Sequence, residues 1–176
     1  MLNALHPTVE QADDHIQGIC YQILARAHSV YGYEDLFLEA IDNAENIATG
    51  IKETIDTHYN QFSLVEVLQE RAQGYTMLWQ PEKALEIYPQ TDKLKPFREP
   101  GEMGSYLIIK AQAHTYSGDM KTGTHLAIQG IELAKSYGSR RHISRVQGMY
   151  DRLSVTPLGK DAPMKDIKEV LMNTQK

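Results

Sequence analysis

The chain has 176 residues, a formal net charge of −5, 41% hydrophobic and 23% charged residues, values that suit one ordinary globular domain. The acidic balance argues against a nucleic-acid-binding surface over the whole molecule, and the one cysteine excludes a disulfide framework and a cysteine-rich zinc site. No apolar run approaches the roughly 20 residues of a membrane span, and the N-terminus does not resemble a signal peptide, so we expect a cytoplasmic protein with no membrane partner.

Apolar residues recur at three- and four-residue spacing along nearly the whole chain, as in amphipathic helices. In chain order this spacing predicts helices over residues 9–31, 36–50, 64–79, 81–88, 105–116, 120–137, 140–153 and, more briefly, 161–172. Pro89 should kink or end the fourth helix, because proline lacks the N–H that a helix interior needs. The prolines and glycines of residues 96–104 predict a loop. No segment alternates with period two for long enough to propose a sheet, so the predicted fold class is all-α.

The predicted helices come in pairs, and three pairs align with one another. The alignment superposes Ala25, Ala72 and Ala111, which are 47 and 39 residues apart. Further aligned sets follow 3, 7, 12, 16 and 19 residues later: His28, Tyr75 and His114; Gly32, Trp79 and Gly118; Phe37, Ala84 and Gly123; Ile41, Tyr88 and Ala127; Ala44, Thr91 and Gly130.

This order of small, aromatic, glycine, small, bulky and small residues resembles the tetratricopeptide repeat (TPR). In that family the small residues let neighbouring helices approach, and the glycine permits the tight turn inside each pair. The resemblance implies one domain over 1–176, a right-handed superhelix of about three degenerate helical hairpins. The repeats would span 18–51, 65–98 and 104–137, with C-terminal capping helices in 140–173.

A narrower resemblance lies in the third repeat and the cap. The segments 130–134 and 138–143 are similar to the C-terminal repeat region of bacterial XRE-type helix-turn-helix regulators. The resemblance implies a bacterial regulatory sensor or scaffold linked to transcription, without the DNA-binding domain that those regulators carry ahead of their repeats.

Polar residues recur on one face of the first helix in each pair, at one and four residues after the aligned alanine and, in the first two pairs, at three residues before it. In stacked helical pairs the first helices line the concave surface. The sequence therefore predicts a non-catalytic module whose concave groove binds a protein or peptide. A solvated face without a ligand is the alternative reading of the pattern, and a structural homo-oligomerisation module is the alternative function. The predicted ligand-binding residues are Gln22, Arg26, Ser29, Gln69, Gln73, Thr76, Gln112 and Thr115.

Basic residues are concentrated near the C-terminus. Residues 135–176 hold 9 Lys and Arg against 4 Asp and Glu, whereas residues 1–134 hold 9 against 19. Arg141, Arg145 and Arg152 share one helical face. Three readings stay open for this face: a solvated surface, a surface for an acidic partner such as the N-terminal repeats of a second copy in a homodimer, and, least favoured, nucleic acid.

No motif indicates catalysis or a cofactor. The chain lacks GxSxG, GxxxxGK[ST], GxGxxG and HExxH, so we expect no enzyme, cofactor or metal site. His28 and His114 occupy equivalent repeat positions and are predicted to be packing residues. Cys20 lies in an apolar stripe and is predicted to be a small buried hydrophobic residue.

Overall fold

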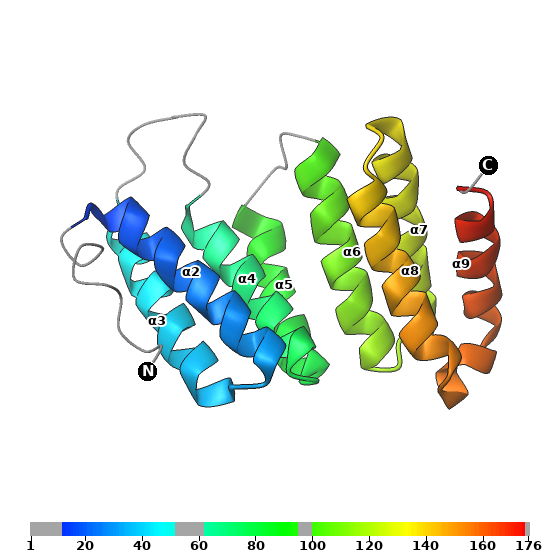
Figure 1. Cartoon of the computed structure of the whole chain (residues 1–176), viewed down its shortest axis with the longest axis horizontal. Coiled ribbons are helices and arrows are strands. Elements are labelled where there is room, and N and C mark those ends of the chain that lie inside the picture. Colours follow the sequence, from blue (N-terminus) through cyan, green and yellow to red (C-terminus); the bar gives the residue numbers. More distant parts are fainter. Residues whose placement is uncertain (1–11, 52–61, 95–99, 175–176) are drawn as a thin grey trace. The chain divides into compact units, whose positions relative to one another are not determined.

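The computed structural model describes residues 12–51, 62–94 and 100–174. These residues form eight α-helices and one short 3-10 helix, with no strand among them (Figure 1). The predicted all-α class is confirmed. Contacts divide the chain into two compact units, Met1–Lys95 and Pro96–Lys176, where the sequence predicted one domain. Stacking of the two units into one array over 1–176 stays a prediction.

The first unit consists of two helical hairpins. Helices α2 (Asp14–Tyr31) and α3 (Glu34–Gly50) form the first hairpin, and α4 (Leu64–Met77) and α5 (Pro81–Leu94) form the second (Figure 1). Helix α4 packs against both α2 and α3, so the first helix of the second hairpin joins the two pairs.

The core of the first unit lies where these helices meet. Its largest members are fully buried aromatic and aliphatic side chains, and small residues let the backbones approach. One continuous cluster comprises Ala25, Phe37, Ala40, Ile41, Ala44, Ala48, Phe62 and Val67.

The second unit repeats this plan. Its helices are α6 (Pro100–Tyr116), α7 (Met120–Ser136), α8 (Arg140–Ser154) and α9 (Ala162–Met172), with the 3-10 helix η1 (Pro157–Lys160) before α9. Helix α8 packs against both α6 and α7, and α9 packs against α7 and α8. The segment predicted to be a cap is therefore a further pair of helices that contributes its own buried side chains to the core of this unit.

Four of the turns between helices contain a residue with left-handed backbone. Gly32, Gly118 and Gly138 have φ of 79°, 91° and 73°, in the left-handed region that glycine adopts without strain. Trp79 occupies the aligned turn of the second hairpin and has φ of 60° although it is not glycine. Trp79 therefore replaces the glycine without changing the turn, because the packing of the hairpin fixes the left-handed conformation.

The aligned repeat positions are buried as the alignment requires. Ala25, Ala72 and Ala111 are all 0% exposed. Among the aligned positions, Gly123 of α7 comes close to the backbone of α6: an added Cβ would lie 2.8 Å from the Thr115 backbone nitrogen and 3.0 Å from the Ala111 carbonyl oxygen. Glycine is required there because a side chain would collide with the backbone of α6.

The proline rules misplaced two helix boundaries. Helix α5 continues through Pro89 to Leu94, because Pro89 faces solvent while Tyr88 and Thr91 beside it are buried and hold both halves of the helix in place. Helix α6 begins at Pro100, five residues before the predicted start, since proline suits the first helical position, where its N–H would have no partner. The predicted helical residues 9–11 and loop residues 96–99 lie outside the described residues.

Candidate binding surfaces

Helices α2 and α4 are bridged by an ion pair at the centre of the predicted ligand face. Arg26 donates from Nε to Glu70 Oε1 at 2.9 Å and from Nη2 to Glu70 Oε2. The hydrogen bond to Glu70 raises the pKa of Arg26, against the opposing effect of burial. The Arg26 side chain is 55% exposed, whereas that of Glu70 is 6% exposed. Arg26 is therefore already held by an internal carboxylate, and much of its donor capacity serves the contact between the two helices.

Three amide side chains of the predicted face remain accessible in part. Gln22, Gln69 and Gln73 are half-buried on α2 and α4. The Gln69 Nε2 atom is shielded from solvent and has no hydrogen-bond partner among the described residues. This side of the first unit thus keeps polar groups that can bind a partner.

Four of the predicted residues are buried instead of facing solvent. Ser29, Thr76, Gln112 and Thr115 are at most 2% exposed. The hydroxyls bond to their own helices: Ser29 to the Arg26 carbonyl at 2.9 Å, and Thr115 to the Ala111 carbonyl at 3.0 Å. The physical reason is that consecutive first helices contact each other directly within each unit, α2 with α4 and α6 with α8. Part of the face assigned to a ligand is used for helix packing.

The predicted basic face lies on α8. Arg141 and Arg152 are exposed and Arg145 is half-buried. Arg152 donates from Nε to the Tyr116 hydroxyl at 2.9 Å, which links α8 to α6. Burial lowers the pKa of His142, and the charges of Arg145 and Arg141 lower it further. Burial is thus the main cause of the shift, and the two arginines place positive charge beside the imidazole.

A groove that the sequence did not predict crosses α3, α4 and α5 of the first unit. It offers about 570 Å³ of open space, with Leu68 and Ile87 as its apolar floor. The remaining lining residues carry polar or charged side chains: Asp42, Glu45, Asn46, Thr49, Arg71 and Gln90. The spacing of Asp42, Glu45, Asn46 and Thr49 on one helical face was the available signal. The predicted ligand face included only the first helix of each pair, so this face of α3 was not part of the prediction.

Arg71 is the fixed charge of this groove. Its Nη2 lies 2.6 Å from Asp42 Oδ1 and 2.7 Å from Glu45 Oε2. Burial of the guanidinium opposes its charge, but the hydrogen bonds and charges of the two carboxylates outweigh this and raise the pKa of Arg71. Arg71 Nε is buried and has no hydrogen-bond partner within the described ranges. The two ion pairs hold the groove wall in one geometry without filling the groove.

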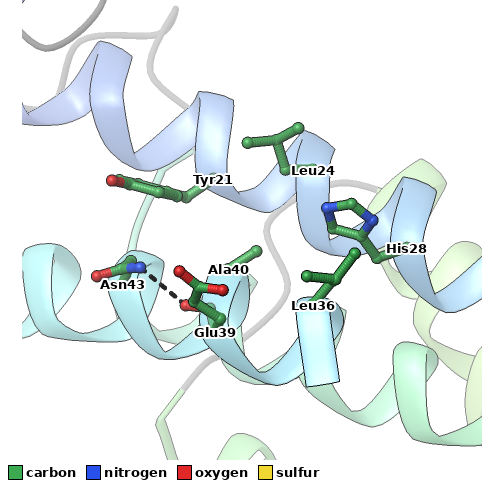
Figure 2. Close-up of a pocket in the computed structure, with 7 residues that line it drawn as sticks. All are labelled: Tyr21, Leu24, His28, Leu36, Glu39, Ala40 and Asn43. Atoms are coloured by element: carbon green, nitrogen blue, oxygen red, sulfur yellow. Dashed lines mark hydrogen bonds between the residues drawn. The ribbon is translucent and has the colours of Figure 1, made fainter. Parts of the chain in front are cut away.

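A second hollow, between α2 and α3, is too small for a ligand. Figure 2 shows Tyr21, Leu24 and His28 of α2 facing Glu39 and Asn43 of α3 across it. The space accommodates about one water molecule. His28 is 5% exposed and its ring lies 6.3 Å from that of Tyr33, so its predicted packing role is confirmed.

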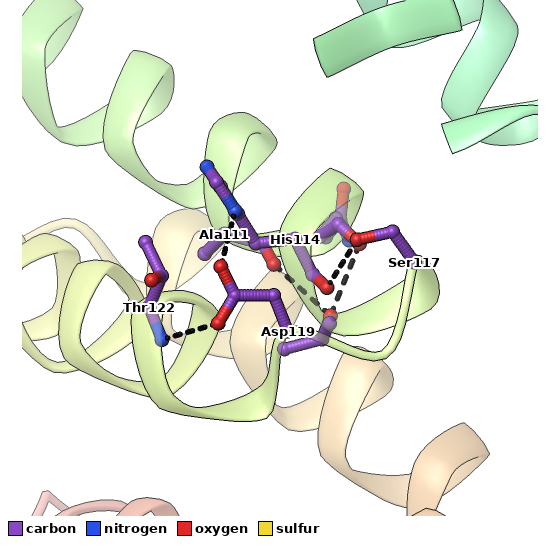
Figure 3. Close-up of polar contacts among 7 residues, drawn as sticks. Ala111, His114, Ser117, Asp119 and Thr122 are labelled. Carbon is purple, nitrogen blue, oxygen red and sulfur yellow. Dashed lines mark hydrogen bonds and ion pairs between the residues drawn. The ribbon is translucent and has the colours of Figure 1, made fainter. Parts of the chain in front are cut away.

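The turn between α6 and α7 holds a compact polar cluster. Asp119 caps α7 by accepting from the Thr122 backbone nitrogen at 3.1 Å, and its other oxygen lies 3.1 Å from His114 Nδ1 (Figure 3). The hydrogen bonds from Thr122 are the main cause that lowers the pKa of Asp119. Ser117 donates to the His114 carbonyl at 2.9 Å. All these contacts are local to the turn, which makes the cluster a structural cap.

The remaining features concern reactive side chains, metal-binding groups and the length of the helices. Cys20 was predicted to be a small buried hydrophobic residue, but it is only half-buried, because its side of α2 is not fully covered. Within the described ranges, no group of three or more His, Cys, Asp or Glu side chains is arranged to hold a metal ion. None of the helices described is both long and apolar enough to cross a membrane.

Comparisons with known proteins returned nothing: no family model, no curated protein and no solved structure matches the chain.

Proposed function

We propose that the protein is a non-catalytic, TPR-like helical-repeat module that binds a protein or peptide, acting as a regulatory sensor or scaffold. Two features support a TPR-like array. The aligned turns share a left-handed residue, and within each unit the first helix of the second hairpin packs against both helices of the first. Stacked helical pairs propagate through such nearest-neighbour contacts and form a superhelix with a binding surface. A link to transcriptional regulation rests on the resemblance of segments 130–134 and 138–143.

The groove over α3, α4 and α5 is the observation that carries the proposed function. Ligand sites combine an apolar floor with a few polar groups that fix orientation. Leu68 and Ile87 supply the floor, and the amides of Asn46 and Gln90 supply both donors and acceptors. A peptide backbone presents alternating N–H and C=O groups that match these amides, while an apolar side chain of the peptide covers the floor.

The charges of the groove add a preference. Arg71 is shared by Asp42 and Glu45, so two carboxylates face one guanidinium. The remaining negative charge favours a peptide with a lysine or arginine beside its apolar residue. This preference complements the net acidic composition of the first 134 residues.

The experiment selects ligands from a random peptide library with the full chain and measures affinity by calorimetry. The double variant Asn46→Ala/Gln90→Ala should lower the affinity for the selected peptide by about tenfold or more, since each lost hydrogen bond contributes about 0.5–1.5 kcal/mol. The matched control, Gln22→Ala/Gln73→Ala, removes two amides from the α2–α4 face and should leave affinity unchanged. If only the control variant loses affinity, the peptide binds at the α2–α4 face and not in the groove. Failure to select any peptide would contradict peptide binding.

A further inference from the structure

Helix α2 presents an apolar stripe away from the core of the first unit. Ile16, Ile23 and Val30 are 48%, 60% and 63% exposed and are separated by seven residues each. Cys20 and Ala27 lie between them on the same face, which is opposite to the fully buried Ala25. The stripe runs about 21 Å along the helix at 1.5 Å per residue.

The corresponding face of α4 is covered by other helices, which shows that this face can pack against a helix. The residues 47 positions after Cys20, Ile23 and Ala27 are Val67, Glu70 and Gly74. All three are buried residues of α4, the helix that packs against α2 and α3 of the first hairpin. At Gly74 an added Cβ would lie 2.1 Å from the Phe37 ring of α3, so this face of α4 is in close helix contact.

We propose that the outer face of α2 binds the same face of a second copy of this chain, in an antiparallel, twofold-symmetric pair of α2 helices. The surface is independent of the peptide groove, whose lining residues come from α3, α4 and α5.

The pattern of side-chain sizes is self-complementary. Along the stripe large residues at 16, 23 and 30 alternate with small residues at 20 and 27, so the order reads the same in both directions about Ile23. In an isologous interface every contact occurs twice: where residue i of one copy touches residue j of the other, residue j of the first also touches residue i of the second. Antiparallel pairing about Ile23 places the small Cys20 of one copy beside the small Ala27 of the other, and the large side chains pack between and beyond these two small pairs.

Charge selects the antiparallel direction. No charged residue lies in the stripe between Ile16 and Val30, but Asp13 and Asp14 stand at its N-terminal end. A parallel pair would bring four carboxylates together, and like charges repel. An antiparallel pair separates them by the length of the helix and aligns the two helix dipoles favourably.

The area is sufficient for a specific dimer. Tyr31, at the C-terminal end of the stripe, is 74% exposed and would cover Ile16 of the other copy. The outward side chains together expose on the order of 500 Å², within the range of the largest apolar patch of a typical monomer, a kind of patch that is often functional. Pairing two copies would bury about 1,000 Å² in total, the lower bound of a specific interface, so we expect a dimer that dissociates in the micromolar range.

The mass of the full chain in solution tests the proposal. Light scattering after size exclusion, at about 100 μM, should give twice the chain mass of 20.0 kDa. Ile23→Lys places two ammonium groups at the axis and should raise the dissociation constant by about 100-fold, with an unchanged helical spectrum. The matched control is Val155→Lys, at an 86% exposed apolar residue of the second unit, which should remain dimeric. A monomeric wild type, or a dimer that survives Ile23→Lys, would overturn the proposal.

Oxidative cross-linking tests the direction of the helices. In the antiparallel pair, Cys20 of one copy faces residue 27 of the other, so Ala27→Cys should give a covalent dimer through two equivalent bonds. Wild-type Cys20 alone should not, because the two Cys20 residues are offset along the axis by about 9 Å, six residues at 1.5 Å each. Efficient cross-linking of the wild type would indicate parallel helices and overturn the arrangement, as would failure of Ala27→Cys to cross-link.

Discussion

Replacing Arg26 by alanine removes the cation that neutralises a buried carboxylate. Glu70 is 6% exposed and receives both of its hydrogen bonds from the Arg26 guanidinium, which is itself 55% exposed. Breaking a fully buried pair by removing one partner costs about 3–5 kcal/mol, whereas an exposed pair contributes about 0–1 kcal/mol. Solvent screens the Arg26 side of this pair, so Arg26→Ala should lower the free energy of unfolding by about 1–3 kcal/mol.

Urea unfolding followed by circular dichroism measures this cost, and a double-mutant cycle isolates its cause. Arg26→Ala leaves the Glu70 carboxylate buried without a counter-charge, and Glu70→Gln removes that charge. The double variant Arg26→Ala/Glu70→Gln should therefore be more stable than the sum of the two single effects predicts. Arg152→Ala is the matched control: this exposed arginine bonds a neutral hydroxyl, that of Tyr116, and its loss should cost less than about 1 kcal/mol. Equal costs at Arg26 and Arg152, with additive effects in the cycle, would refute the assignment of Arg26 to a structural pair.

Three further predictions concern the packing and the electrostatics of the second unit. Gly123→Ala should destabilise by about 1–3 kcal/mol in urea unfolding, because its Cβ collides with the backbone of α6, while Gly148→Ala in α8 has room and should be neutral or stabilising. Gly118→Ala should cost about 1–2 kcal/mol by the same measurement, because alanine is strained at φ of 91°. The NMR titration of His142 should give a pKa below 6.5, and Arg145→Gln should raise it. Since the folded pKa lies below the unfolded one, protonation of His142 should reduce stability as pH falls from about 6.5 toward the folded value.

The helical pairs could be predicted from the sequence because their pattern is local. Apolar spacing placed the helices, and the aligned alanines and turn glycines identified positions that are indeed buried or left-handed. Proline rules were less reliable, since burial of Tyr88 and Thr91 outweighs the local cost of Pro89. Local propensity yields to tertiary packing at that position.

The candidate sites could be predicted only in part, because exposure depends on contacts between helices. Periodicity placed Ser29 and Gln22 on one face of α2 but could not indicate that Ser29 is buried and Gln22 half-exposed. The groove depends on residues from three helices, and its central ion pairs join Arg71 to α3 over a sequence separation of 29 residues at Asp42. These ion pairs cannot be predicted from the sequence without knowing that α4 packs on α3.

Chemical-shift mapping of the isotope-labelled full chain, titrated with a library-selected peptide, tests peptide binding in the groove most directly. Peptide binding in the groove predicts that the largest shifts occur at Asn46, Arg71 and Gln90, with little change at Gln22 and Gln73. Shifts concentrated at Gln22 and Gln73, or absent from α3 and α5, would contradict it.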